Sequence, residues 1–172
     1  MLFRSMSSLV AYVNAITKEK IATVQNEQMM SEANAFFPEA DIFETVEGEY
    51  SAMVADVYLA KTGEDILGVC VRAVPIGFGG EMSILVGIDK DGAVISARIL
   101  DDSETAGLGS KAKELSFIGQ YNGKTGPFEV VKTQTGAENE IITLTGATIT
   151  SKAVSSGVYE AVKTAQVVLA NF

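Results

Sequence analysis

Two pairs of apolar segments in the middle of the chain, each joined by a short turn, constrain the fold more than any other feature. The expected strands cover residues 53–60, 65–73, 82–88 and 93–100. In the third segment apolar residues occupy every second position, at Met82, Ile84, Val86 and Ile88, which is the period of a strand with one buried face. The loops 61–64 and 89–92 each contain a glycine and are too short for a crossover, so the strands that they join run antiparallel. The sequence therefore predicts a twisted antiparallel sheet.

Both ends of the chain show helical periodicity. Between residues 7 and 37 apolar residues recur every three to five positions, with no glycine or proline before Pro38. A second helix is expected over about 149–169, where Val154, Val158, Ala161 and Val168 share one stripe. A short helix is expected at 110–115, and short strands at 128–132 and 141–144. Because no linker or repeat interrupts the pattern, we expect one α+β domain over residues 1–172, its sheet flanked by the N- and C-terminal helices.

The charged and reactive residues exclude several classes of function. The chain has 13 basic and 22 acidic residues, a formal net charge of −9, which repels nucleic-acid phosphates. It has no histidine, which excludes Ser-His-Asp and Cys-His catalysis and the common zinc sites. The single cysteine, Cys70, lies in an apolar segment and is expected to be inert core. Asp89 and Asp91 flank a turn and are expected to be solvated, so we predict no metal site and no catalytic residue. Further acidic residues expected at the surface are Glu39, Asp41, Asp101 and Asp102.

The segment 143–151, Thr-Leu-Thr-Gly-Ala-Thr-Ile-Thr-Ser, joins a short strand to the start of the last helix. The hydroxyl residues at this junction are Thr145, Thr148, Thr150 and Ser151. In one interpretation these hydroxyls cap the helix by accepting hydrogen bonds from its first N–H groups, and spacing alone favours this interpretation. In the other, the same N–H groups and the helix dipole bind a phosphate, Gly146 and Ala147 allow close approach of the backbone, and a threonine carries a phosphoester.

Residues 144–151 resemble the S/T-G-A-T-x-T-S flavinylation motif of FMN-binding domains. Such domains occur in the G subunit of Rnf-type electron-transport complexes and in the C subunit of sodium-translocating NADH:quinone oxidoreductases. Further segments resemble the same family in the same order: 13–21, 77–80, 84–89, 103–109 and 117–123. The resemblance therefore covers most of the chain, and the preserved order makes it specific.

The resemblance implies FMN as the cofactor, with its phosphate esterified to Thr148 and its ring facing the loop 104–109. The implied cofactor-binding residues are Phe78, Glu104, Thr105, Gly107, Leu108, Gly109, Thr145, Gly146, Ala147, Thr148, Ile149 and Thr150. Phe78 and Tyr121 either stack on the flavin or fill the core, and burial habits favour the core for both. Ala106 replaces the family's usual proline, which is expected to loosen the loop slightly. Ile142 stands where many members carry an aspartate; if the transferase reads that aspartate, the modification is expected to be less efficient here, although Glu140 is nearby.

The implied function is that of an electron-transfer subunit of a membrane-bound, ion-coupled redox complex, rather than a catalyst on its own. Its partners would be the other subunits and a flavin transferase that installs FMN from FAD. The flavin domain would lie on the extracytosolic face of the cell membrane, behind a missing N-terminal anchor that precedes the helix 1–37. Two alternatives stay open: a stand-alone extracytosolic flavin carrier, and a non-redox domain in which Thr148 is part of a helix cap.

Overall fold

The computed structural model describes residues 27–172. Residues 27–36 are helical, and the helix ends where Pro38 approaches, because a proline disfavours helical backbone in the residue before it. The rest of the expected N-terminal helix and the expected anchor lie outside the described residues. Within the described part of the chain, no helix combines the length and the apolar character needed to cross a membrane.

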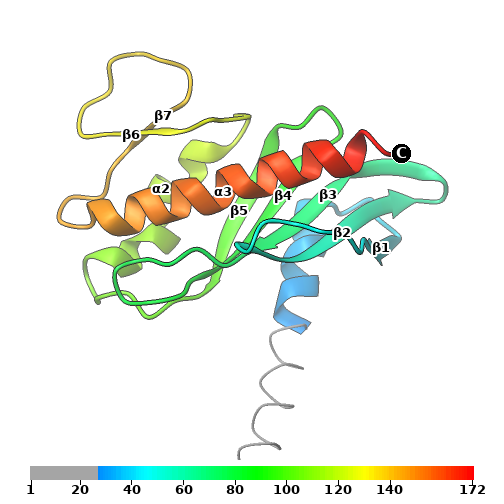
Figure 1. Cartoon of the computed structure of the whole chain (residues 1–172), viewed down its shortest axis with the longest axis horizontal. Helices are drawn as coiled ribbons and strands as arrows, with labels where there is room; N and C mark the ends of the chain where they lie inside the picture. The colour runs from blue at the N-terminus through cyan, green and yellow to red at the C-terminus, as the bar shows by residue number, and fades with distance from the viewer. Residues whose placement is uncertain (1–26) are drawn as a thin grey trace, which may run out of the picture.

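Five antiparallel strands form the sheet, in the order β1-β2-β3-β4-β5 (Figure 1). The strands are β1 (Ile42–Thr45), β2 (Val54–Thr62), β3 (Asp65–Ala73), β4 (Ser83–Asp89) and β5 (Val94–Asp101). Tight turns close the β2–β3 and β4–β5 hairpins, with Gly63 at φ 59° and Gly92 at φ 85°, values that favour glycine. Asp89 Oδ1 accepts hydrogen bonds from the N–H groups of Asp91 and Ala93, 2.9 Å each, and so braces the second turn.

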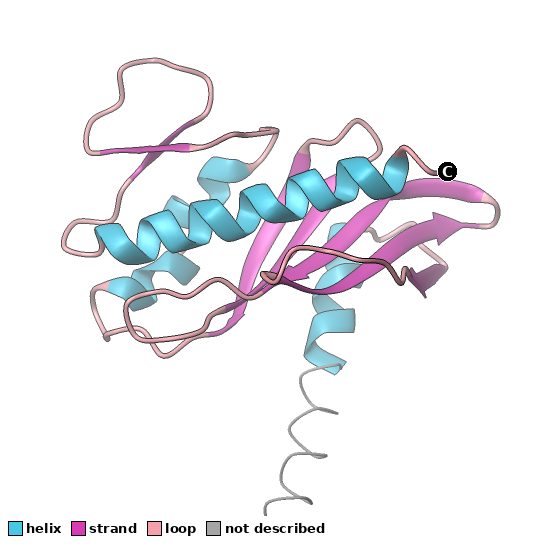
Figure 2. Ribbon diagram, viewed as in Figure 1, coloured by secondary structure: helices cyan, strands magenta, loops and turns pink. Residues whose placement is uncertain are grey.

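A helix covers each face of the sheet (Figure 2). The long C-terminal helix α3 (Thr148–Leu169) packs on one face, against β3 and β4. On that side alternate strand residues such as Val71 and Val86 meet Val158 of the helix in the main core. The helical residues 27–36 lie on the other face, where Phe36 packs with Cys70 and Leu85. Both faces of the sheet are covered, so the expectation of one buried face for the strand 82–88 is wrong: Leu85, between the alternating residues Ile84 and Val86, is fully buried as well.

Between β5 and α3 the chain builds a smaller layer that supports the start of α3. It consists of η1 (Gly109–Lys113), α2 (Leu115–Ile118), η2 (Gly119–Tyr121), β6 (Glu129–Val131) and β7 (Glu140–Ile142). Tyr121 is fully buried there, and its hydroxyl lies 2.7 Å from Ser155 Oγ on α3. The contact joins the layer to the helix, so the loop 102–109 that leads into the layer is held beside the first turn of α3.

The α+β fold with an antiparallel sheet and a C-terminal helix is confirmed. Three features were not expected. The edge strand β1 follows Pro38 in a polar segment without alternation, and β6 pairs with β7 in parallel, as a separate two-stranded sheet. Asp102, expected to be a solvated charge, has a side chain only 6% exposed, because its carboxylate forms an ion pair with Lys113, with Oδ2 2.7 Å from Nζ.

Candidate functional site

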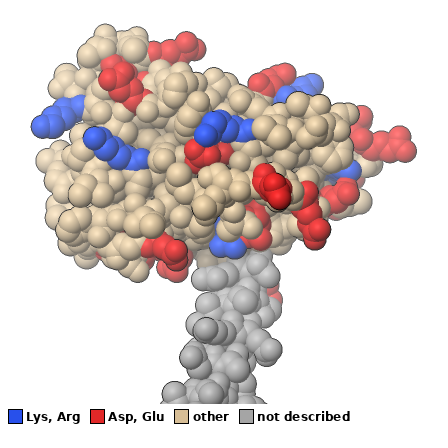
Figure 3. All heavy atoms as spheres, in the orientation of Figure 1, with Lys and Arg blue, Asp and Glu red and all other residues tan. Residues whose placement is uncertain are grey.

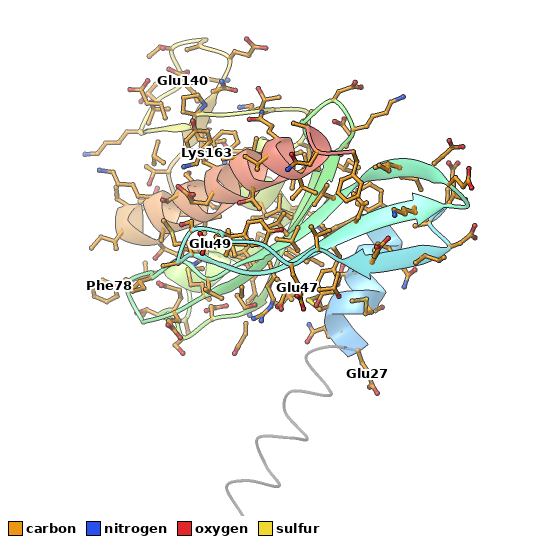
Figure 4. The ribbon with its side chains drawn as sticks, turned by 45° about the vertical axis from the view of Figure 1, so that its right-hand side comes forward. Glu27, Glu47, Glu49, Phe78, Glu140 and Lys163 are labelled. Atoms are coloured by element: carbon orange, nitrogen blue, oxygen red, sulfur yellow. The ribbon has the colours of Figure 1, made fainter. Side chains whose placement is uncertain are left out.

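A cleft of about 360 Å³ opens where the loop 104–109, the β3–β4 loop and the first turn of α3 meet. Ten of the twelve residues expected to bind the cofactor line this cleft; Thr145 and Gly107 do not. Phe78 reaches it from the β3–β4 loop and lies at the edge of the fold, near the beginning of α3 (Figure 4). The structure therefore brings together three segments that lie far apart in the sequence.

The start of α3 forms one end of the cleft. Ala147 occupies the N-cap position, and no side chain caps the helix. Ser151 N–H donates to Ala147 O, whereas the N–H groups of Thr148, Ile149 and Thr150 have no acceptor among residues 27–172. The interpretation of the motif as a side-chain helix cap is therefore wrong. Three free N–H groups at the positive end of a 22-residue helix form a site for a phosphate or another anion.

Gly146 shapes the turn just before the helix. Its φ is 79°, a left-handed conformation that glycine adopts without strain. A Cβ at this position would lie 3.2 Å from Leu108 Cδ2, which is a tight contact. The glycine therefore keeps the backbone close to the loop 104–109 while leaving the mouth of the cleft open.

The four hydroxyls of the motif have different environments. Thr150 is buried, and its Oγ1 donates to Glu104 Oε2 at 2.7 Å. Ser151 is also buried; its Oγ donates to Ala147 O at 2.9 Å and accepts from Leu144 N–H at 3.0 Å. Thr145 and Thr148 are exposed, and of these two only Thr148 lines the cleft. Thr148 is thus the accessible hydroxyl that faces the free helix terminus.

Apolar side chains form the rim of the cleft. Phe78 is 68% exposed, Ile149 57% and Leu108 44%. The expectation that Phe78 belongs to the core is wrong, whereas Tyr121, fully buried, is a core residue as expected. Exposed large apolar residues gathered at one cleft are typical of a ligand-binding surface. Together with the helix terminus they fit a ligand with a flat apolar part and an anionic end.

The loop 102–109 is held by its own hydrogen bonds. Asp102 Oδ1 accepts the N–H of Glu104 at 2.9 Å, and Ser110 Oγ accepts the N–H of Gly107 at 3.0 Å. Gly107 has φ 77°, so the loop turns back at this residue and brings Leu108 to the cleft. Sequence reasoning missed the ion pair between Asp102 and Lys113, because neither residue type nor spacing signals that these two side chains meet.

Charge is distributed unevenly over the molecule. Residues 27–101 contain 14 acidic and 4 basic residues, against 7 and 6 in residues 102–172. On the face shown in Figure 3, many of the acidic side chains gather on the right, away from the start of α3. The cleft is built mainly from the nearly neutral part of the chain, so the acidity of the protein opposes an anionic ligand less there than elsewhere. The described residues contain no group of three or more acidic or cysteine side chains arranged to hold a metal ion.

Comparison with known proteins finds a matching family model, similar sequences and a solved structure with a similar fold. Residues 77–163 match the family model of the FMN-binding domain. The chain is 38% identical, over 156 residues, to the G subunit of the proton-translocating ferredoxin:NAD(+) oxidoreductase complex of Clostridium ljungdahlii, and the match covers 90% of this chain and 79% of that protein. It is 34% identical to the G subunit of the Na(+)-translocating ferredoxin:NAD(+) oxidoreductase complex of Acetobacterium woodii, over 88% of this chain and 79% of that protein. The crystal structure of NqrC from Shewanella oneidensis has the same fold, with a TM-score of 0.57 at 15% identity, over 79% of this chain and 74% of that chain.

Proposed function

Because the chain belongs to the FMN-binding domain family, we propose that it is an electron-transfer subunit that carries FMN in the cleft, with the flavin phosphate esterified to Thr148. The observation that carries this proposal is the position of Thr148. Its hydroxyl is exposed, lines the cleft, and belongs to the first residue of a helix whose first N–H groups have no acceptor within residues 27–172. A phosphate held by those N–H groups would lie within reach of the hydroxyl.

The rest of the cleft fits the flavin ring. Phe78, Leu108 and Ile149 provide apolar surface that a planar aromatic ring would cover, and covering it removes these side chains from water. When bound, FMN accepts and releases electrons, and the protein holds the ring and tunes its potential. The side chains of Phe78, Leu108 and Ile149 would contact the ring.

The ester would be made by a separate enzyme. A threonine hydroxyl is a poor nucleophile without a neighbouring base, and the chain contains no histidine to act as one. A flavin transferase that uses FAD would form the bond between Thr148 Oγ1 and the FMN phosphorus, break the FAD pyrophosphate bond and release AMP. The hydroxyl proton would pass to a base of the transferase. The covalent link keeps the flavin attached between encounters with partners.

We further propose that residues 1–172 act as one flavin domain of an Rnf-type, ion-translocating membrane complex. The two relatives from Clostridium ljungdahlii and Acetobacterium woodii are named as G subunits of such complexes, and the matches cover most of both chains. The other subunits would then be the electron partners. The flavin domain would lie on the extracytosolic face, attached to the membrane through an N-terminal anchor.

Intact mass after co-expression with a flavin transferase tests the covalent link. We expect a gain of about 438 Da, the mass of FMN less water, on the wild-type chain. Thr148→Ala should show no gain. Thr145→Ala is the matched control, since it removes an exposed hydroxyl three positions away that does not line the cleft, and it should be modified like the wild type.

Two results would contradict the proposal. If the wild-type chain gains no mass while the same transferase modifies another substrate, the covalent link is wrong. If Thr148→Ala still gains the mass and Thr145→Ala does not, Thr145 carries the ester and the assignment to Thr148 is wrong.

A further inference from the structure

Glu104 connects three segments of the cleft through one carboxylate. Its Oε2 accepts the hydroxyl of Thr150, on the first turn of α3, at 2.7 Å. Its Oε1 accepts the N–H of Gly79, on the β3–β4 loop, at 3.1 Å. Glu104 itself belongs to the loop 102–109 and also lines the cleft. The three walls of the cleft are therefore joined at a single side chain.

Glycines make room for this carboxylate. A Cβ on Gly77 would lie 2.2 Å from Glu104 Oε1, and a Cβ on Gly109 would lie 2.2 Å from Oε2. A Cβ on Gly79 would lie 2.0 Å from the carbonyl oxygen of Ser103, so the β3–β4 loop also passes directly over the loop that carries Glu104. At Gly79 the close atom is backbone, so a side chain there would force the two loops apart, whereas a side chain at Gly77 or Gly109 would displace the Glu104 carboxylate. Gly77 and Gly109 thus leave the space that the Glu104 carboxylate occupies, which we call the socket.

The socket lies immediately beside Phe78. This residue is flanked by Gly77 and by Gly79-Gly80, so its own backbone offers little restraint, and its ring is mostly exposed. The hydrogen bond from Gly79 to Glu104 fixes the loop one residue away from the ring. The backbone N–H of Glu104 is in turn held by Asp102, whose carboxylate is paired with Lys113. The loop beside Phe78 is therefore connected, through Glu104, to the ion pair between Asp102 and Lys113.

We propose that Glu104 is a positioning residue that holds Phe78 against the cleft and locks the loop 102–109 to the first turn of α3. The effect of this inference on the flavin rests on the proposed function. The two hydrogen bonds of the Glu104 carboxylate, which we call the clamp, are present in the chain without flavin. The Gly79 N–H and the Thr150 hydroxyl both need a hydrogen-bond partner at position 104. A glutamine keeps one carboxyl-type oxygen for Gly79, and its amide can donate to the Thr150 hydroxyl, so it preserves both contacts without the charge.

The first test measures amide hydrogen exchange of Gly79 in the chain without flavin. Loss of the acceptor in Glu104→Ala should speed exchange at Gly79 by about tenfold, the effect of losing one hydrogen bond to a charged group. Glu104→Gln should exchange at close to the wild-type rate. Glu81→Ala is the matched control, because it removes an exposed carboxylate from the β3–β4 loop, which also carries Gly79, and leaves both hydrogen bonds of Glu104 in place.

The second test uses the visible circular dichroism of the flavin in the modified protein, which reports how rigidly the ring is held. Glu104→Ala should reduce this signal at least about twofold, and Glu104→Gln should restore it. If Glu104→Ala does not fold, Thr150→Val removes one of the two contacts and Thr150→Ser restores it, with the same expected pair of results.

The outcomes separate the clamp from the flavin proposal. Unchanged Gly79 exchange in Glu104→Ala, or a Glu104→Gln variant as impaired as Glu104→Ala, overturns the clamp. Altered exchange with an unchanged flavin signal overturns the part of the proposal that concerns Phe78 and the ring. A wild-type chain that never carries flavin refutes the proposed function, while the exchange measurement on that chain still decides whether the clamp exists.

Discussion

Gly109→Ala is predicted to destabilise the protein through a single steric conflict. Gly109 is buried at the start of η1 and does not have a positive φ, so alanine is compatible with its backbone. The new Cβ would lie 2.2 Å from Glu104 Oε2 and 2.9 Å from Thr150 Oγ1. Because both atoms belong to the same hydrogen bond, the methyl group must displace the carboxylate or the hydroxyl.

The expected cost follows from two effects that overlap. Forcing a methyl group into a filled site costs about 1–3 kcal/mol. Losing a hydrogen bond to a charged group costs about 1.5–3 kcal/mol where that bond is partly buried. Since displacement of Glu104 relieves part of the steric conflict, we expect the free energy of unfolding to fall by about 2–4 kcal/mol in total.

Urea denaturation followed by far-ultraviolet circular dichroism measures this change. Gly119→Ala is the matched control: its φ is −69°, its ψ is −11°, and a Cβ there would meet no atom within 4 Å. It should leave the free energy of unfolding unchanged or raise it by about 0.4–1 kcal/mol. In a Glu104→Ala background the cost of Gly109→Ala should fall below its wild-type value, because the carboxylate is gone while the contacts of 2.9 Å with the Cβ of residue 104 and with Thr150 Oγ1 remain. A cost below about 0.5 kcal/mol in the wild-type background, or an equal cost in both backgrounds, would refute the reasoning.

Three further predictions concern residues outside the cleft. Tyr121→Phe should lower the free energy of unfolding by about 1–2 kcal/mol in the same urea assay, because it leaves the buried Ser155 hydroxyl without its partner; a neutral result would contradict this. The pKa of Glu140 is held below its usual 4.5, chiefly by the Thr135 hydroxyl that donates to its carboxylate and then by backbone N–H groups. Because the pKa is lower in the folded state, the ionised Glu140 stabilises the fold above pH 4.5, and this stabilisation is lost as the pH falls through the lowered value. Glu140→Gln should therefore flatten the acid side of a plot of melting temperature against pH. An unchanged slope on that side would argue against this prediction. Burial raises the pKa of the Cys70 thiol to about 12, so a thiol reagent should label the protein only after unfolding, and rapid labelling of the native chain is the contrary result.

The sequence was informative wherever structure depends on local pattern. The strand 65–73 was predicted with the bounds that β3 has, and the last helix was predicted to within one residue of its start. The strand β1 was missed because its register depends on β2, its pairing partner, and not on its own alternation. The parallel pairing of β6 with β7 was missed for the same reason, since three-residue strands have too little pattern to specify a partner.

In the candidate site, too, some features follow from local sequence pattern and others only from the fold. The motif 144–151 and the loop 103–109 stand out in the sequence because glycines and hydroxyl residues recur there at family spacing. Their meeting in one cleft was implied by resemblance, not by any local property of the residues. The exposure of Phe78 and the burial of Asp102 went against expectation, because burial depends on what lies opposite a side chain rather than on its type.

The sequence by itself determined the class of fold, the place of the turn before the last helix and the exclusion of histidine chemistry, because periodicity, glycine positions and composition act through nearest neighbours along the chain. Only the tertiary structure decided which of four neighbouring hydroxyl residues is both exposed and part of the cleft lining, and that Glu104 joins the walls of the cleft. These features arise from contacts between residues 25 and 46 positions apart, which no local pattern encodes.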